Sequence, residues 1–343
     1  MRKTEHLTIE KPDVQDSGIQ RAAAILRDGG LVAIPTETVY GLAADALNPQ
    51  AVGRIFEAKG RPSDNPLIVH IAHLEHITNV ARTVPESADK LAKAFWPGPL
   101  TMVLPKASGI PDKTSGGLDT VGIRLPSHPV ARAVIEAAGV PLAAPSANLS
   151  GSPSPTTASH VLADMEGRIE AVLDGGPCGV GVESTVLSLA GKRPLLLRPG
   201  GVTPEQIESV IGPIDIHPAV YHALEQGQKA ESPGMKYKHY APHTKVMVVK
   251  GDGQSFARYV NSRAGKVGAL CFDEDLPHLH VPAVSYGRMG QPDTQAQGLF
   301  DALRRLDGLD ADVVYARYPD VDGMGLAVYN RLMRAAAFEV IEL

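Results

Sequence analysis

The sequence predicts an α/β protein built from a large mixed, twisted sheet with helices and a smaller Rossmann-like α/β domain. Apolar runs typical of strands alternate with amphipathic helical patterns along most of the chain. This alternation lapses between 212 and 244, where the stretch ESPGMKYKHYAPHT is too irregular for a core element. We therefore expect a first domain at 1–211, a linker at 212–244 and a second domain at 245–343.

The first domain begins with a helical pattern, after which strand patterns and helical patterns alternate. Strand patterns lie at 29–35, 67–71, 100–105, 120–126, 141–145, 171–175, 184–189 and 194–199. Helical patterns lie at 17–28, 50–58, 85–95, 129–138, 156–166 and 204–211. Two of these helices are expected to begin at Pro129 and Pro204, with Ser127 or His128 and Thr203 as N-caps. So many strands imply one large mixed sheet.

The second domain shows a regular strand and helix alternation. Strands are expected at 245–251, 266–272, 281–285 and 312–318, and helices at 254–263, 294–307 and 325–338. Because a helix follows nearly every strand, we expect a parallel sheet.

Composition narrows the class of protein. The first residues, MRKTEHLTIEKPD, lack an apolar segment, and no run of about 18 apolar residues occurs, which favours a cytoplasmic location without membrane insertion. Cys178 and Cys271 lie far apart and form no C-x-x-C, so buried, inert thiols are expected. A net charge of −5 gives no general attraction to nucleic acid, although it is compatible with a local basic cleft.

Polar loops follow several predicted strands, where open α/β sheets place their ligands. The sequence lacks G-x-x-x-x-G-K-[ST], H-E-x-x-H and G-x-S-x-G, the signatures of common nucleotide-, zinc- and ester-cleaving sites. Instead, PTETVYGLAADA (35–46) gathers the hydroxyls of Thr36, Thr38 and Tyr40. Such a loop suits a small polar substrate, and ordinary turn chemistry explains it equally well.

Cations stand out in two places. Lys59 and Arg61 lie in the Gly- and Pro-containing loop KGRPSDNP, which can aim both at a phosphate, and His70 follows at the end of the next strand. A solvated basic pair and a structural histidine are the alternatives. Arg124 lies inside an apolar strand and needs an anionic partner there, either a substrate carboxylate or an internal Asp.

Three further stretches are rich in small polar residues. APSANLSGSPSPT (144–156) offers many backbone N–H groups and hydroxyls for phosphate or ribose, although its composition also fits a flexible loop. The glycines of LDGGPCGVGVESTV (173–186) allow backbone to approach a ligand closely. Arg198 precedes a helix N-terminus, a plausible arrangement for an anion.

Taken in order, these motifs resemble the Sua5/YrdC/YwlC family of threonylcarbamoyl-AMP synthases. The resemblance is carried by PTETVYGL, KGRP-x-x-NPL-x-VH, WPGPLT, VGIRLP, PSAN-x-SG-x-PSPT, LDGG-x-x-x-VGVESTV, LRPGG and SPGMKYKHYAP. It covers residues 17–343 and matches the long Sua5 form, in which a C-terminal domain follows the YrdC-like catalytic domain.

The resemblance implies a nucleotidyltransferase reaction. L-threonine, bicarbonate and ATP would yield threonylcarbamoyl-AMP and pyrophosphate, and a separate tRNA threonylcarbamoyl transferase would use the product to modify the adenosine beside the anticodon. Mg²⁺ would accompany ATP without a dedicated protein cage. The linker would fold over the active site, with Lys236 and Tyr240 excluding water.

The resemblance also assigns site residues. The L-threonine set would be Thr36, His70, Arg124 and Ser184. The ATP set would be Lys59, Arg61, Asn65, Thr120, Ser146, Asn148, Ser154, Arg198 and Tyr240. Lys59, Arg61 and Arg124 would be the catalytic cations.

Two other functions compete with the synthase. An RNA-binding module fits poorly with the acidic net charge, although a weak RNA contact stays open. A carbamoyl transferase like the hydrogenase-maturation proteins would carry zinc-type cysteine clusters, and this sequence has two isolated cysteines.

Overall fold

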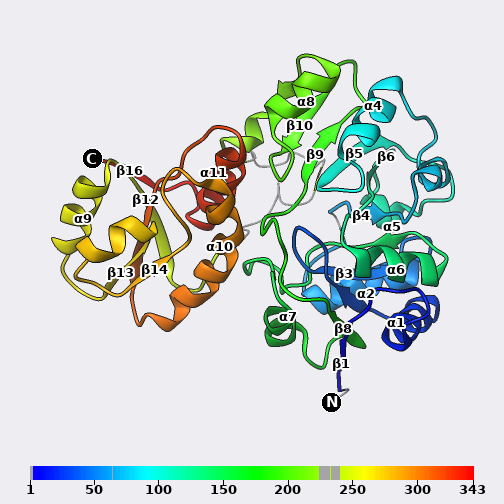
Figure 1. Ribbon diagram of the computed structural model, residues 1–343, viewed down its shortest axis with the longest axis horizontal. Coiled ribbons are helices and arrows are strands. Elements are labelled where there is room, and N and C mark those ends of the chain that lie inside the picture. Colours follow the sequence, from blue (N-terminus) through cyan, green and yellow to red (C-terminus); the bar gives the residue numbers. More distant parts are fainter. Residues whose placement is uncertain (1–2, 64, 224–231, 233–239) are drawn as a thin grey trace.

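The computed structural model describes residues 3–63, 65–223, 232 and 240–343. Within these residues the chain forms two α/β units, one around an 11-stranded sheet and one around a 5-stranded sheet. Figure 1 shows the two units side by side, with helices α10 and α11 of the smaller unit between the two sheets. The predicted fold class is confirmed.

The large sheet is mixed. Its strands are β1 (Glu5–Thr8), β2 (Val32–Ile34), β3 (Gly41–Asp45), β4 (Ile68–His70), β5 (Leu100–Pro105), β6 (Thr120–Arg124), β7 (Leu142–Ala143), β8 (Ala171–Asp174), β9 (Thr185–Ser188), β10 (Leu195–Arg198) and β11 (Asp215–Ile216). Their order is β1-β8-β2-β3-β7-β4-β6-β5-β9-β10-β11. Strand β3 lies within the segment expected to be a polar loop. Its Gly and Ala residues have low strand propensity, and antiparallel pairing with β2 and β7 decides its conformation.

Helices cover both faces of the large sheet. They are α1 (Ser17–Arg27), α2 (Pro49–Lys59), α3 (Ile77–Val80), α4 (Glu86–Phe95), α5 (Asp112–Ser115), α6 (Pro129–Ala138), α7 (Ala158–Met165) and α8 (Pro204–Ile211), with 3-10 turns η1 (Leu74–His76) and η2 (Pro218–Val220). Strand β2 shows the two-sided burial: Ala33 belongs to the core under α2, α4, α7 and α8, whereas Val32 and Ile34 belong to the core under α1 and α6.

The two predicted proline-initiated helices both form. Thr203 caps α8 in a capping box with Gln206, as its sequence indicates. His128 occupies the N-cap position of α6, and its side chain makes no capping hydrogen bond.

The small sheet is parallel throughout, as the sequence predicts. It contains β12 (Lys245–Lys250), β13 (Val267–Cys271), β14 (Ala283–Ser285), β15 (Val313–Arg317) and β16 (Val340–Glu342), with helices α9 (Gly253–Asn261), α10 (Pro292–Arg305) and α11 (Met324–Ala335) and turns η3 (Asp273–His278) and η4 (Leu306–Gly308). Its order is β14-β13-β15-β12-β16. Strand β15 thus separates β12 from β13, which are neighbours in the common doubly wound orders.

The units meet through buried polar contacts. Arg331 of α11 is 0% exposed, and its Nε lies 2.8 Å from Glu183 Oε2 in the first unit. The side chains of Asn330 and Arg334 donate to the carbonyls of Val220 and Ala219, each at 2.8 Å. A buried guanidinium with fixed partners holds the two units in one arrangement.

Two sequence-based expectations stay predictions. In the described part of the chain, no helix is both long and apolar enough to cross a membrane. The cytoplasmic location is not tested by this finding. The boundaries of the predicted linker are also untested, and most of SPGMKYKHYAP, including Lys236, lies outside the described residues.

Candidate active site

A polar pocket lies where strands β4 and β6 end. These strands are parallel neighbours, and their last residues, His70 and Arg124, are register partners. Loops after β2, β7 and β10 and before β9 complete the walls. The polar residues that line the pocket are Thr36, Thr38, Arg61, His70, Arg124, Ser146, Asn148, Glu183, Ser184, Arg198 and Tyr240. The chain thus gathers loops far apart in sequence around one polar pocket, as open α/β sheets do.

Arg124 already has an internal anionic partner. It is 4% exposed, its Nη2 lies 2.6 Å from Glu37 Oε1, and its Nη1 donates to Thr38 Oγ1 at 3.0 Å. Burial pushes the pKa of Glu37 up, but the attraction of Arg124 outweighs it and leaves that pKa below its ordinary value. The internal acid weighed from the sequence therefore exists, as Glu37 rather than an Asp.

His70 is a neutral side chain beside this ion pair. Its ring is buried, with Nδ1 lying 3.2 Å from the carbonyl oxygen of Ile68. Burial and then the charge of Arg124 lower its pKa to about 3. Thr36 and Thr38 lie close together, with their hydroxyl oxygens 2.9 Å apart. This end of the pocket therefore offers one cation, whose charge is paired with Glu37, and neutral polar groups.

Ser184 connects this end with Arg198. Its hydroxyl lies 2.8 Å from Thr101 Oγ1. Arg198 donates from Nε to the Ser184 carbonyl at 3.1 Å and from Nη2 to the Ser184 hydroxyl at 3.3 Å. Burial lowers the pKa of Arg198 to about 10, so it remains a cation at neutral pH. The structure thus brings the four predicted threonine-binding residues to one pocket.

Lys59 lies beneath the other end of the pocket. It is the last residue of α2, and Gly60 ends the helix with φ of 68°, a conformation that glycine adopts readily. Its ammonium donates to the carbonyls of Ser146 at 2.5 Å and Asn148 at 2.7 Å, and its side chain is 2% exposed. Burial, followed by the nearby Arg61, lowers its pKa well below the ordinary value.

A buried carboxylate, Glu183, organises the remaining residues at this end. It accepts the Ser154 hydroxyl at 2.6 Å and pairs with Arg331. Burial alone would raise the pKa of Glu183, but Arg331 and then Arg198 bring it down to about 2. Tyr240 lines the pocket and has its ring centroid 5.1 Å from that of Phe300. Glu183 was missed from sequence, although it stands in the motif VGVESTV next to Ser184.

Four predicted ATP residues do not line this pocket: Lys59, Asn65, Thr120 and Ser154. Lys59 and Ser154 each contact a residue that does line it, Asn148 and Glu183 respectively. Asn65 is fully buried, and neither of its side-chain polar atoms has a hydrogen-bond partner among the described residues. Thr120 is the first residue of β6 and lies roughly 13 Å along the strand from Arg124, on the same face of the sheet. Their roles stay predictions.

The described residues hold no group of three or more His, Cys, Asp and Glu side chains suited to a metal ion. The donors of the pocket are mostly cations, hydroxyls and amides, which fit the oxygens of a phosphate chain better than a bare Mg²⁺. The association of Mg²⁺ with ATP is not tested by this arrangement.

Comparison with known proteins identifies the family. The family model described as "Telomere recombination", which groups Sua5, YciO and YrdC proteins, matches residues 24–200. This chain belongs to the Sua5/YrdC family. A second model, "Threonylcarbamoyl-AMP synthase, C-terminal domain", matches residues 202–337 of this Sua5/YrdC-family chain.

Full-length relatives carry one name. The threonylcarbamoyl-AMP synthase of Pyrococcus abyssi is 48% identical, over 96% of this chain and 97% of its own length. The threonylcarbamoyl-AMP synthase of Bacillus subtilis is 49% identical, over 99% of both chains. This Sua5/YrdC-family chain is therefore similar to these synthases in both of its units.

Solved structures show the same similarity, over nearly the whole chain or over part of it. The crystal structure of P. abyssi Sua5 complexed with L-threonine has a TM-score of 0.89 and 45% identity, covering 99% of each chain. Escherichia coli YciO has a TM-score of 0.52 and 26% identity, covering 58% of this chain and 96% of its own. The Sua5/YrdC-family chain thus shares its two-unit architecture with Sua5 and only part of its length with YciO.

Proposed function

We propose that this chain is an L-threonylcarbamoyladenylate synthase, a nucleotidyltransferase that makes threonylcarbamoyl-AMP and pyrophosphate from L-threonine, bicarbonate and ATP. The observation that carries the proposal is the buried Arg124 at the end of β6, which faces a pocket lined by hydroxyls and further cations. The full-length relatives named threonylcarbamoyl-AMP synthase support it.

The threonine end of the pocket is the end around Arg124. The threonine carboxylate would bind the Arg124 guanidinium, which stays in place because Glu37 and Thr38 hold it. Thr36 and Ser184 would contact the substrate hydroxyl, and the uncharged His70 would avoid repelling the substrate ammonium. The site therefore recognises a small hydroxy amino acid by its carboxylate and its side chain.

The nucleotide end is the end around Lys59. A triphosphate beside Arg61 and Arg198 would pair with these two cations, and its charge would favour the protonated form of the nearby Lys59. The remaining proposed ATP contacts are Asn65, Thr120, Ser146, Asn148, Ser154 and Tyr240. Mg²⁺ would arrive on ATP as part of the substrate.

The reaction needs positioning rather than a covalent enzyme intermediate. The threonine amine adds to carbon dioxide derived from bicarbonate and loses a proton, giving a carbamate. A carbamate oxygen then forms a bond to the α-phosphorus of ATP while the bond from that phosphorus to the bridging oxygen breaks, releasing pyrophosphate. The cations take up the charge that develops on the phosphate oxygens. We further propose that a separate transferase, acting in the cytoplasm, moves the product onto tRNA.

The proposal is tested by incubating the purified protein with ATP, magnesium and bicarbonate, and with threonine, serine or no amino acid. We expect pyrophosphate release and an adenylate of the threonylcarbamoyl mass with threonine, and much less of both with serine. Folded protein that yields no adenylate in promptly quenched samples would contradict the proposed function.

A further inference from the structure

Helix α10 of the C-terminal unit contacts the loop that forms the nucleotide end of the pocket. We propose that Arg304, on α10, is a positioning residue of the nucleotide site: it holds the loop at 148–154 against Lys59. The inference rests on the proposed function for its substrate, ATP, but its geometry is independent of the reaction. Arg304 itself does not line the pocket.

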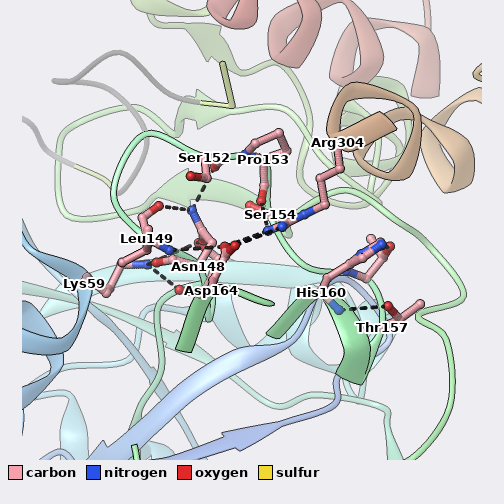
Figure 2. A network of polar contacts seen from close by, with 12 residues as sticks. Lys59, Asn148, Leu149, Ser152, Pro153, Ser154, Thr157, His160, Asp164 and Arg304 are labelled. Carbon is pink, nitrogen blue, oxygen red and sulfur yellow. Dashed lines mark hydrogen bonds and ion pairs between the residues drawn. The ribbon is translucent and has the colours of Figure 1, made fainter. Parts of the chain in front are cut away.

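Arg304 makes three polar contacts across the boundary between the units, which Figure 2 shows from close by. Its Nη1 and Nη2 donate to the two carboxylate oxygens of Asp164 at 3.1 Å and 2.8 Å, and Nη2 also donates to the Pro153 carbonyl at 2.6 Å. Both partners of this ion pair are mostly buried, 14% and 12% exposed. A bidentate ion pair of this kind fixes the orientation of the guanidinium relative to the carboxylate as well as their separation.

The carboxylate of Asp164, which binds Arg304, also contacts the loop at 148–154. Asp164 accepts the backbone N–H of Leu149 at 3.3 Å. The side chain of Asn148 closes the loop by donating to the carbonyls of Leu149 at 2.7 Å and Ser152 at 2.8 Å. Arg304 thus binds the loop directly, at Pro153, and indirectly, at Leu149.

The loop in turn contacts both the side chain and the backbone of Lys59. The Lys59 ammonium donates to the Asn148 carbonyl, and the Lys59 carbonyl accepts the N–H of Ser150 at 3.0 Å. Asn148 also lines the pocket. A displacement of this loop would therefore move both a pocket wall and the carbonyls that orient a cation, and sub-ångström errors of this kind lower binding and catalysis.

Other residues of α10 contact the same region, so the helix acts as a support. Gln297 donates to the Gly179 carbonyl at 2.7 Å. Asp301 lies 3.3 Å from His160, whose Nδ1 is 3.3 Å from the Thr156 backbone nitrogen. Gln297, Asp301 and Arg304 are spaced so that they share one face of the helix. Arg304 is the member of this face that binds the loop itself.

The test compares Arg304→Gln with Arg305→Gln. Arg305 is the next residue on α10, 60% exposed, and its ion pair with Asp301 is long at 3.7 Å, so its loss is expected to change nothing measurable. We expect Arg304→Gln to weaken binding of a non-hydrolysable ATP analogue by about tenfold, measured by calorimetry without threonine. The KM for threonine should stay within about twofold, because the Arg124 end has its own supports.

Two further variants separate positioning from general stability. Arg304→Lys keeps the charge and should recover part of the nucleotide affinity. Asp164→Asn should weaken ATP binding too, and the double variant should be little worse than Arg304→Gln alone, since both residues act in one chain of contacts. All assays are run well below the melting temperature of each variant, and if Arg304→Gln does not fold, Arg304→Lys and Asp164→Asn decide the matter.

The outcomes also separate this inference from the proposed function. Unchanged nucleotide affinity in the Arg304 variants, or an equal loss of threonine and nucleotide binding, would overturn the positioning role. Wild-type protein that binds the ATP analogue but makes no adenylate would instead contradict the synthase assignment and leave the positioning result standing.

Discussion

The two ends of the pocket are supported in different ways. Around Arg124, the supporting partners Glu37, Thr38 and Gly98 all come from the large unit. Around Lys59, the loop that orients the cation is itself held from the C-terminal unit by Arg304. We infer that the proposed threonine end is built by the large sheet and its own loops, whereas the proposed nucleotide end depends on the contact between units.

The largest expected effect comes from removing Arg124, whose supporting partners all come from the large unit. Arg124→Ala should lower threonine-dependent pyrophosphate release by more than about 100-fold, because it removes the proposed partner of the substrate carboxylate and leaves Glu37 buried without a cation beside it. The KM values for threonine and ATP give the measurement. Binding of the ATP analogue should stay within about threefold if the two ends are independent. An unchanged KM for threonine would show that the carboxylate binds elsewhere.

The second prediction concerns the contact between units, and it is a loss of folding stability when Arg331 is replaced. Arg331→Met leaves Glu183 buried without its ion-pair partner, which should lower the free energy of unfolding by about 3–5 kcal/mol. Glu183→Gln in the same chain should recover much of that loss. The matched control is Arg193→Met, whose pair with Asp215 is exposed and should be worth less than about 1 kcal/mol. Denaturant unfolding that gives equal values for both Arg variants would rule out the special role of Arg331.

This pair also has a defined pH window. The pKa of Glu183 is about 2 in the folded chain, below its ordinary value of 4.5, so its stabilisation is fully present above pH 4.5. It is lost as the pH falls from 4.5 towards 2.

These comparisons also show what sequence can and cannot predict. The strand at 120–126 and the need of Arg124 for an anion follow from an apolar pattern interrupted by one charge. The identity of that anion, Glu37, depends on how the loop after β2 returns to the end of β6, which no local pattern encodes. The sequence of the helix does not distinguish Arg331 from an exposed arginine, because its partner, Glu183, lies in the other unit. The motif resemblance named nine residues that line the pocket, because family motifs carry information on such long-range contacts.

A smaller effect is expected from the neutral residue beside Arg124. The folded-state pKa of His70, about 3, lies below its ordinary 6.5, so its stabilising contribution is fully present above pH 6.5 and is lost as the pH falls towards 3. Between pH 7.5 and 5, the wild type should lose about 1–2 kcal/mol of stability that His70→Gln does not lose. Denaturant melts at the two pH values measure this difference. Parallel losses in both proteins would mean that His70 does not titrate in this way.

The smallest effect is expected at the far end of β6. Thr120→Ala removes at most one neutral hydrogen bond to ATP, so the KM for ATP should rise by less than about fivefold and that for threonine should not change. A loss comparable to that of Arg124→Ala would show that the nucleotide site extends along the strand to a critical contact there.

The most direct test of the account follows the carbon of bicarbonate. Protein supplied with threonine, ATP, magnesium and carbon-13 bicarbonate should form an adenylate that carries the heavy carbon, with one pyrophosphate released for each adenylate. Mass spectrometry of promptly quenched samples reads both products. Release of pyrophosphate with an adenylate that lacks the label would mean that the threonine carboxylate itself attacks ATP, and would contradict the proposed carbamate route.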